Sequence, residues 1–251
     1  MTCCNYISLY LFFLFSLCSF YEIESFIPVG RHAHSSVFTG NKLYFFGGRL
    51  SSNEYSDDVF YLDLSQSFDM AAPPWNDLTP IVRIPFRSGW ATASFSNISN
   101  EPTIYLFNGL TPGDDVNEFI KVPDIYSFEI NSFTWSTPII KGSPPKRRMR
   151  MQSVIDNTGK MYIFGGMANA EVGSTIKFFN ETIIFNTVEL SWSINNSPVD
   201  RRASYTATLL SNGIIVYIGG FNGTKLIDIS QIDIYDTYSL TWSNKVCIIL
   251  L

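Results

Sequence analysis

The chain has few charged residues and almost no histidine. Lys, Arg, Asp and Glu make up 16% of its 251 residues, below the roughly 25% that is usual in soluble domains. The net charge is −5 at pH 7, with a sequence pI near 5.0. Because the chain has no basic excess to neutralise phosphates, nucleic acid is excluded from its predicted partners. One basic run, Lys146–Arg150, is interpreted as a solvated loop that leads into a strand.

Cysteine is scarce, and three of the four cysteines lie close together at the start. Cys3, Cys4 and Cys18 precede residue 20, and Cys247 is the fourth. If the first segment is removed, Cys247 alone remains and an intrachain disulfide cannot form. We therefore expect a domain that is held together by its apolar core rather than by disulfides.

A long apolar run occurs at the beginning of the chain. Residues 7–20 read ISLYLFFLFSLCSF without a charge. This run is shorter than the roughly 20 apolar residues of a membrane span and fits a secretory signal. We predict a signal peptide over residues 1–25 and a secreted or extracellular product; an uncleaved anchor is the alternative, because the preceding MTCCNY contains no Lys or Arg. In a secreted chain the sequons would be predicted glycan acceptors, at Asn97, Asn180, Asn195 and Asn222.

Motifs of known catalytic or cofactor chemistry are missing. The sequence has no H-E-x-x-H motif, phosphate-binding glycine loop or nucleophile elbow. His32 and His34 alternate and could place two rings on one face of a strand, as in a metal pair, but packed histidines are the interpretation that we favour. The acidic pairs Asp57–Asp58 and Asp114–Asp115 are interpreted as solvated loop acids. We therefore predict no catalytic, cofactor or metal residue.

A fourfold repeat fills the rest of the chain. Four short apolar and aromatic runs each end in glycine, which predicts strands closed by a breaker. These glycines are expected to adopt positive φ and to let neighbouring backbones approach closely. They are Gly47 and Gly48, Gly109, Gly165 and Gly166, and Gly219 and Gly220. A strand opened by an arginine is predicted upstream of each copy, beginning at Arg31, Arg87, Arg150 and Arg202.

An aromatic strand and a tryptophan complete each copy. The strands span residues 58–63, 124–129, 182–186 and 232–236, and the tryptophans that follow are Trp75, Trp135, Trp192 and Trp242. The last three tryptophans stand six residues beyond the end of their strand, whereas Trp75 stands twelve beyond Asp63. The difference predicts an insertion in a turn around residues 66–71. A large ring at a fixed position suits packing between sheets that stack face to face.

This pattern resembles the kelch repeat, over residues 31–242. The resemblance implies an all-β fold, a kelch-type β-propeller of four-stranded blades around a channel. We expect this propeller over residues 26–251, with repeats at about 31–86, 87–146, 147–200 and 201–245.

Four copies are fewer than kelch propellers usually have, so the ring could be incomplete. Three alternatives stay open. The chain could be a truncated product of a longer propeller, a ring closed by four blades, or an open propeller whose unpaired strand edges join another chain. Residues 26–30 could also complete the last blade as an outer strand, with Phe26 in the place of tryptophan.

A propeller without a recognisable catalytic site predicts a binding scaffold. Function on such folds resides in loops carried by a rigid frame. The long connections at residues 50–57, 110–123 and 167–180 are expected to share one face and to bind a protein, or alternatively a glycan.

Two other functions are kept as alternatives. One is an oxidoreductase like galactose oxidase, whose catalytic domain resembles a kelch propeller, although no residue here matches the copper–radical site of that family. The other is the ectodomain of a longer membrane-anchored protein, in which the apolar residues 246–251 lead into a span.

Overall fold

The computed structural model describes residues 26–98, 101–107, 109–111, 124–168 and 176–246. The described residues form strands, turns and loops without a helix, and so contain no helical segment that could cross a membrane. The predicted signal peptide, Cys247 and parts of two predicted loops lie outside the described residues.

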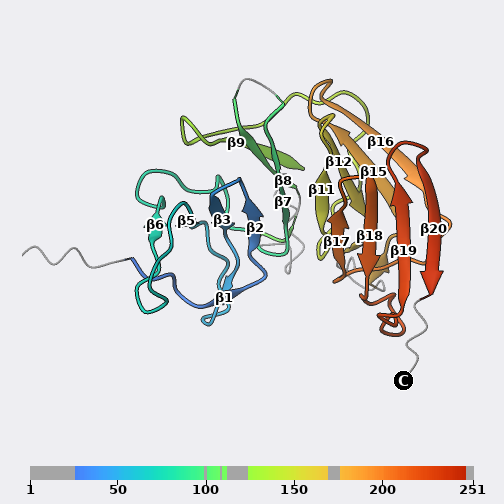
Figure 1. Ribbon diagram of the computed structural model, residues 1–251, viewed down its shortest axis with the longest axis horizontal. Helices are drawn as coiled ribbons and strands as arrows, with labels where there is room; N and C mark the ends of the chain where they lie inside the picture. The colour runs from blue at the N-terminus through green and yellow to red at the C-terminus, as the bar shows by residue number, and fades with distance from the viewer. Residues whose placement is uncertain (1–25, 99–100, 108, 112–123, 169–175, 247–251) are drawn as a thin grey trace, which may run out of the picture.

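Four antiparallel sheets of four strands follow one another along the chain (Figure 1). Each sheet is built from consecutive sequence, and we number them as blades one to four. Blade one contains β2 (Ser35–Phe38), β3 (Lys42–Phe46), β5 (Val59–Asp63) and β6 (Trp75–Asp77). Blade two contains β7 (Thr92–Ser96), β8 (Thr103–Phe107), β9 (Ile125–Glu129) and β10 (Thr134–Ser136). Blade three contains β11 (Ser153–Ile155), β12 (Lys160–Phe164), β15 (Glu181–Asn186) and β16 (Ser191–Asn196). Blade four contains β17 (Thr206–Leu209), β18 (Ile214–Ile218), β19 (Gln231–Asp236) and β20 (Thr241–Val246).

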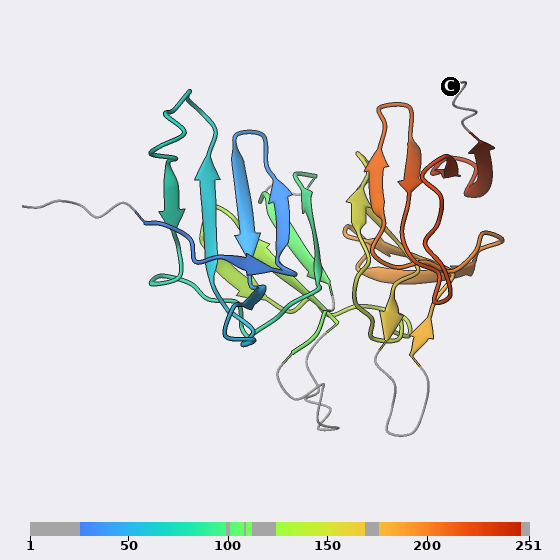
Figure 2. The same ribbon diagram turned by 90° about the horizontal axis from the view of Figure 1, so that it is seen from below.

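The blades form an arc. Their first strands are neighbours in chain order, since β2 contacts β7, β7 contacts β11 and β11 contacts β17. Blade one and blade four stand at the two ends of the arc (Figures 1 and 2). The prediction of an all-β propeller with four four-stranded blades is confirmed.

Burial of the second strand in each blade follows its place in the arc. In β8 of blade two all five residues are buried, and in β12 of blade three four of five are. In β18 of blade four buried and half-buried residues alternate, and β3 of blade one buries Tyr44 and Phe46 but not their neighbours. A strand between two sheets is covered on both faces, whereas a strand in an end blade is covered on one.

The four tryptophans occupy the same register, as predicted. Each pairs with the penultimate residue of the preceding aromatic strand: Leu62, Phe128, Phe185 and Tyr235. Trp135, Trp192 and Trp242 also pack against the blade before their own, through contacts with Phe46, Phe107 and Phe164 at centroid distances of 5.7, 5.5 and 4.6 Å. Trp75 packs on Phe45 and Phe60 of its own blade. The extra residues before Trp75 form the turn between β5 and β6.

The repeat glycines adopt positive φ, as predicted. The reason is clearest at Gly47 and Gly165, where the next blade comes closest. A Cβ on Gly47 would lie 2.4 Å from the carbonyl oxygen of Ser88, and one on Gly165 would lie 2.4 Å from that of Arg202. Each glycine therefore lets the backbone of the following blade approach.

The arginines predicted to open blades two and three are wrong by one and two positions, respectively. With the sheets aligned on their pairings, Arg31 corresponds to Arg148 and Arg202, and Ser88 holds this place in blade two. Arg150 and Arg87 therefore do not open their blades in the way that Arg31 does. Arginine is frequent just before these strands, so spacing alone could not choose among neighbouring arginines.

The prediction for residues 26–30 is also wrong. Blade four already has four strands of its own, and residues 26–30 form none. Phe26 instead packs edge-on against Phe60 of blade one, with ring centroids 5.7 Å apart.

Candidate functional site

One end of the propeller carries the long loops; we call it the loop face. The first strand of each blade begins here and the second strand ends here (Figure 2). Short ribbons extend the blades at this end: β1 (Arg31–His32) with β4 (Arg49–Leu50), and β13 (Met167–Ala168) with β14 (Lys177–Phe178). The described parts of the predicted loops, at residues 50–57, 110–111, 167–168 and 176–180, share this end as expected. Residues 112–123, which include Asp114 and Asp115, and 169–175 lie outside the described residues.

A chain of backbone hydrogen bonds links the four blades at the loop face. Each blade has one non-glycine residue with φ between 55° and 61° just before its first strand: Ala33, Trp90, Arg150 and Ser204. The N–H of Trp90 donates to the carbonyl oxygen of Ala33 at 2.7 Å, that of Arg150 to Trp90 at 3.2 Å, and that of Ser204 to Arg150 at 2.7 Å. The left-handed backbone turns each segment toward the preceding blade, and these bonds join the starts of neighbouring blades at the loop face.

Three of these side chains form a cluster that we call the Trp90 cluster. The guanidinium carbon of Arg150 lies 4.2 Å from the centroid of the Trp90 ring. The ring of His32 approaches Trp90 at 6.0 Å with an interplanar angle of 69°. Arg150 and His32 are exposed and Trp90 is half-buried. A cation over an indole face combines positive charge with apolar area, and tryptophan and arginine are the residues most enriched among binding hot spots.

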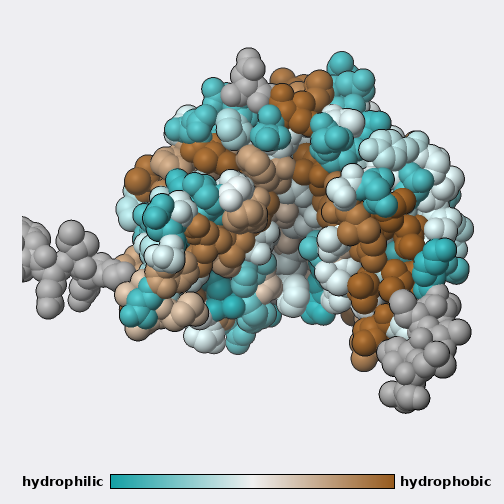
Figure 3. Space-filling model, viewed as in Figure 1, coloured by the Kyte–Doolittle hydropathy of each residue, from teal (hydrophilic) through white to brown (hydrophobic). Residues whose placement is uncertain are grey.

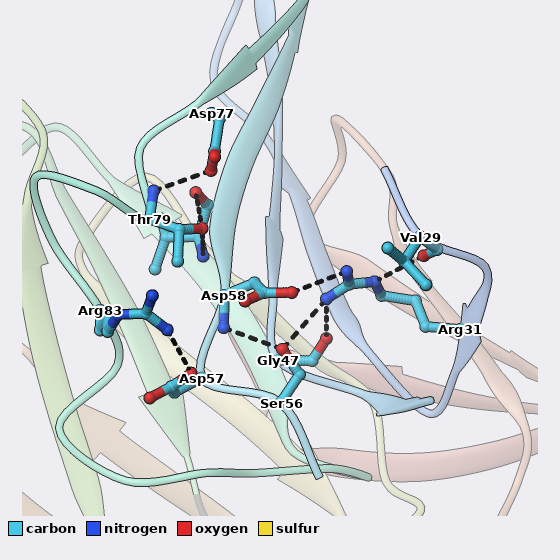
Figure 4. A network of polar contacts seen from close by, with 10 residues as sticks. Val29, Arg31, Gly47, Ser56, Asp57, Asp58, Asp77, Thr79 and Arg83 are labelled. Atoms are coloured by element: carbon cyan, nitrogen blue, oxygen red, sulfur yellow. Dashed lines mark hydrogen bonds and ion pairs between the residues drawn. The ribbon is translucent and has the colours of Figure 1, made fainter. Parts of the chain in front are cut away.

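Further cations on the loop face lie over aromatic rings. Arg49 lies over Tyr55 at 5.6 Å, and Lys177 over Phe179 at 5.0 Å. Nearby acids are engaged, since Asp57 pairs with Arg83 at 2.9 Å and Asp58 with Arg31 at 2.8 Å (Figure 4). Asp57 and Asp58 are thus half-buried and ion-paired loop acids, with 27% and 29% of their side chains exposed. Exposed cations, Arg150 and Lys177, therefore lie beside aromatic rings at this end of the blades.

Buried arginines hold the loops at their base. Arg148 donates to the carbonyl oxygen of Gly165 at 3.0 Å and to Glu181 at 2.8 Å. Arg31 makes the matching bonds to Gly47 and Asp58 in blade one (Figure 4). The solvated-loop interpretation of Lys146–Arg150 is wrong at Arg148, which is 2% exposed. Each of these arginines bonds both a glycine carbonyl and an acid at the start of the third strand. Sequence reasoning missed this role, because a single arginine leaves no recognisable pattern in the sequence.

Blades two and four vary this arrangement. In blade four Arg202 pairs with Asp233, which lies two residues further along its strand than Asp58 does in blade one. Burial raises the pKa of Asp233, and the charge of Arg202 opposes that rise. In blade two Ser88 replaces the arginine, and burial raises the pKa of Asp124 while the charge of Arg147 opposes it.

The two histidines are not brought together. The ring of His32 faces Trp90, whereas the ring of His34 packs against Phe45 at 5.5 Å, because Ala33 between them has a left-handed backbone. Burial and the charge of Arg31 lower the pKa of His34. Within the described ranges, His, Cys, Asp and Glu form no group of three or more that could hold a metal.

The four sequons differ in accessibility. Asn97, Asn180 and Asn195 are exposed. Asn222 is 6% exposed, and its amide nitrogen donates to Asp200 at 2.7 Å while its oxygen accepts from Thr224 and Lys225. A glycan on Asn222 would break these bonds, so glycosylation stays a prediction for the other three positions.

A pocket whose lining includes none of the Trp90 cluster lies between blades two and three. It measures about 170 Å³, and its lining includes Asp124, Ile140 and Trp192. Ligand pockets usually exceed roughly 300 Å³. The exposed loop face is therefore a better candidate for function than this pocket.

Comparison with known proteins gives a consistent result. A family model described as the Attractin/LZTR1 beta-propeller matches residues 16–246. Kelch domain-containing protein 3 of Rattus norvegicus is 26% identical over 227 residues, which cover 84% of this chain and 56% of that protein. Host cell factor 2 of Homo sapiens is 28% identical over 208 residues, covering 77% of this chain and 25% of that protein. The chain spans about half the length of its Kelch domain-containing protein 3 relatives and a quarter of host cell factor 2.

Proposed function

Because the chain belongs to the Attractin/LZTR1 β-propeller family of kelch-type propellers, we propose that it is a non-catalytic, secreted or lumenal scaffold whose loop face binds a protein. Its relatives include proteins named for kelch domains, which supports a role in protein interaction. The observation that carries the proposal is the Trp90 cluster, where a half-buried indole lies against the exposed cation of Arg150. Backbone hydrogen bonds from the neighbouring blades hold this cluster in place before any partner arrives, which lowers the entropic cost of binding.

The chemistry of the cluster defines the partner. Arg150, Arg49 and Lys177 present positive charge beside aromatic rings. A complementary partner offers carboxylates together with an apolar side chain, so an acidic protein segment is the proposed ligand. We favour a protein over a glycan because Arg150 and His32 already flank the ring of Trp90, which leaves little open face for a sugar to stack on.

Affinity capture with matched variants tests this proposal. The wild-type chain and the variants Trp90→Ala, Arg150→Ala and Lys42→Ala would be compared by quantitative mass spectrometry. Lys42 is the control, because it also lies over an aromatic ring, Tyr61 at 4.6 Å, but in the first hairpin turn at the opposite end of the blade. Partners retained by the wild type and Lys42→Ala but lost from both loop-face variants would support the proposal. Partners that bind all four proteins equally would contradict it.

Secretion requires a separate measurement. Expression of the whole chain in secreting cells should deliver a product that lacks about residues 1–25, as determined by intact mass. Enzymatic removal of N-glycans should reduce that mass, and Asn222→Gln should leave the glycan content unchanged. A product that stays in the cells with its N-terminus intact would refute the secreted localisation without bearing on the loop face.

A further inference from the structure

Four residues with left-handed backbone stand in a row at the loop face, and we call them the left-handed row. They are Ala33, Trp90, Arg150 and Ser204, with φ of 58°, 61°, 59° and 55°. Each occupies the same place before the first strand of its blade, and the N–H of each later member donates to the carbonyl oxygen of the member before it. The row therefore runs, after Ala33, from an indole through a cation to a hydroxyl.

The backbone of the left-handed row is unfavourable for every residue that has a Cβ. In this conformation the Cβ crowds the carbonyl oxygen that follows, whereas glycine adopts it freely. The chain follows this preference in the junction turns, where Gly47 and Gly165 have positive φ. Glycine could make the same backbone hydrogen bonds in the left-handed row, yet no member of the row is glycine. The side chains of the row are therefore present at a cost to stability.

Contacts within the chain offset little of this cost at Arg150 and Ser204. In the part of the chain that the structure describes, the guanidinium of Arg150 lies over the Trp90 ring but forms no hydrogen bond or ion pair. The hydroxyl of Ser204 forms no hydrogen bond to a described residue either. Trp90 differs, because its ring also packs against the buried cluster that contains Met149 and Met167. Strained backbone that local contacts do not explain is typical of sites that hold a ligand.

Display of a side chain at the surface does not by itself require left-handed backbone. Strands present side chains to solvent with ordinary extended backbone, as Figure 3 shows for the apolar side chains over β18 and β19. In the left-handed row, by contrast, hydrogen bonds between blades accompany the strained conformation and fix the members relative to one another. A partner that lies across blades two to four would therefore meet three side chains in a set order.

We propose that Ser204 is a further contact residue of the loop face, and that Trp90, Arg150 and Ser204 together select the partner at the expense of stability. This inference rests on the proposed binding of an acidic protein segment. An apolar side chain of the segment then lies against Trp90, a carboxylate faces Arg150, and the next polar group exchanges a hydrogen bond with Ser204. Ala33 offers a methyl group and takes no part in the selection.

Glycine variants measure the cost to stability without any ligand. Ala33→Gly, Arg150→Gly and Ser204→Gly should each raise the Tm by about 2 °C, because glycine removes the crowded Cβ. Ser193→Gly is the matched control for the change from serine to glycine. Ser193 is exposed in β16 and lacks positive φ, so glycine there should lower the Tm by a similar amount. A Tm that does not rise in Arg150→Gly and Ser204→Gly would overturn the claim that these side chains are kept at a cost.

A synthetic probe measures the contact role. The probe is a fluorescein-labelled octapeptide of alternating glutamate and leucine, and its fluorescence anisotropy gives the dissociation constant. Arg150→Gly should raise this constant by about 10-fold or more, and Ser204→Gly by about 5-fold. Ala33→Gly and Ser193→Gly should leave it within about twofold of the wild type. Ser204→Ala removes the hydroxyl but keeps the Cβ, so it should weaken binding as Ser204→Gly does without raising the Tm.

The outcomes separate this inference from the proposed function. Weaker binding by both Ser204 variants, with a higher Tm in Ser204→Gly alone, would support the inference. A probe that binds the wild type and both Ser204 variants with equal affinity would overturn the contact role of Ser204 and leave the loop-face proposal standing. A probe that fails to bind the wild type at about 1 mM would refute an acidic segment as the ligand, and with it the contact role of Ser204.

Discussion

At the scale of single residues, buried arginines join the loops to the blades. Arg148 has no exposed side-chain surface, whereas 30% of the side chain of its partner Glu181 is exposed. Burial lowers the pKa of Arg148, and the hydrogen bond and charge of Glu181 counteract this. The arginine also donates a hydrogen bond to the carbonyl oxygen of Gly165. It therefore holds the backbone of the glycine turn in addition to balancing the charge of Glu181.

Removal of the acidic partner should therefore be costly. Glu181→Gln leaves the guanidinium of Arg148 buried without its counter-charge, and we expect a loss of about 3 kcal/mol in the free energy of unfolding. Asp57→Asn is the control, because the Asp57–Arg83 pair is more exposed and should change stability by less than about 1 kcal/mol. Urea unfolding curves of both variants measure the difference. Equal losses of unfolding free energy in the two variants would show that the Arg148–Glu181 pair stabilises the fold no more than the exposed Asp57–Arg83 pair does.

At the scale of the element, each blade depends on a glycine turn and a tryptophan strand. The glycine turn lets the next blade approach, and the tryptophan closes the contact from that blade. A substitution that would be harmless in an isolated sheet can therefore destabilise the protein because it disturbs the contact with the neighbouring blade. Two predictions follow from contacts between blades.

The glycine turns should respond according to their neighbours. Gly165→Ala would put a methyl group against the carbonyl oxygen of Arg202 and should cost at least about 3 kcal/mol. Gly40→Ala has the same kind of left-handed backbone without a neighbour and should cost about 1–2 kcal/mol. Chemical unfolding of the two variants gives the comparison. A Gly165→Ala protein as stable as Gly40→Ala would mean that the blades do not approach there.

The tryptophans should respond according to their place in the arc. Trp192 contacts Phe107 of blade two as well as Phe185 of its own blade, so Trp192→Ala should cost about 3 kcal/mol. Trp75 contacts rings of its own blade, and Trp75→Ala should cost clearly less. Thermal unfolding of both variants provides the test. The reverse order would contradict the assignment of Trp75 to an end face.

At the scale of the whole molecule, the arc concentrates buried tyrosines between blades three and four. Tyr162, Tyr205, Tyr217 and Tyr235 are all buried there. Burial raises the pKa of Tyr217 well above its ordinary value, and the nearby tyrosines add to this effect. Burial also raises the pKa of Tyr44, between blades one and two, to about 12.

Alkaline solution should therefore unfold the protein. The tyrosines are neutral in the folded state, and their pKa values there lie above the value near 10 of the unfolded chain. Stability is then fully present below pH 10 and decreases as the pH rises from 10 through 12, because the unfolded state loses protons that the folded state retains. Tyrosinate absorbance and circular dichroism should change together in this window. Ionisation of the buried tyrosines themselves at pH 10 in the folded protein would contradict their burial, whereas exposed Tyr238 does not bear on the test.

The sequence by itself determined the four blades. Short apolar strands, the glycines that end them and tryptophans at a constant spacing are local features of the sequence. Together they predict four sheets with the same strand pairing. The same spacing located the glycines of positive φ and the inserted turn before Trp75. These features recur at the same positions in every repeat, so the sequence displays them even though the glycines and tryptophans serve contacts between blades.

Only the tertiary structure decided which side chains meet between blades. It joined His32, Trp90 and Arg150 from three blades, placed Arg148 rather than Arg150 in the buried position, and set Phe26 on blade one instead of blade four. It also left Trp75 and Ile218 on opposite ends of the arc. These contacts depend on how one sheet stacks on the next and on left-handed backbone at non-glycine residues, and neither produces a pattern along the chain.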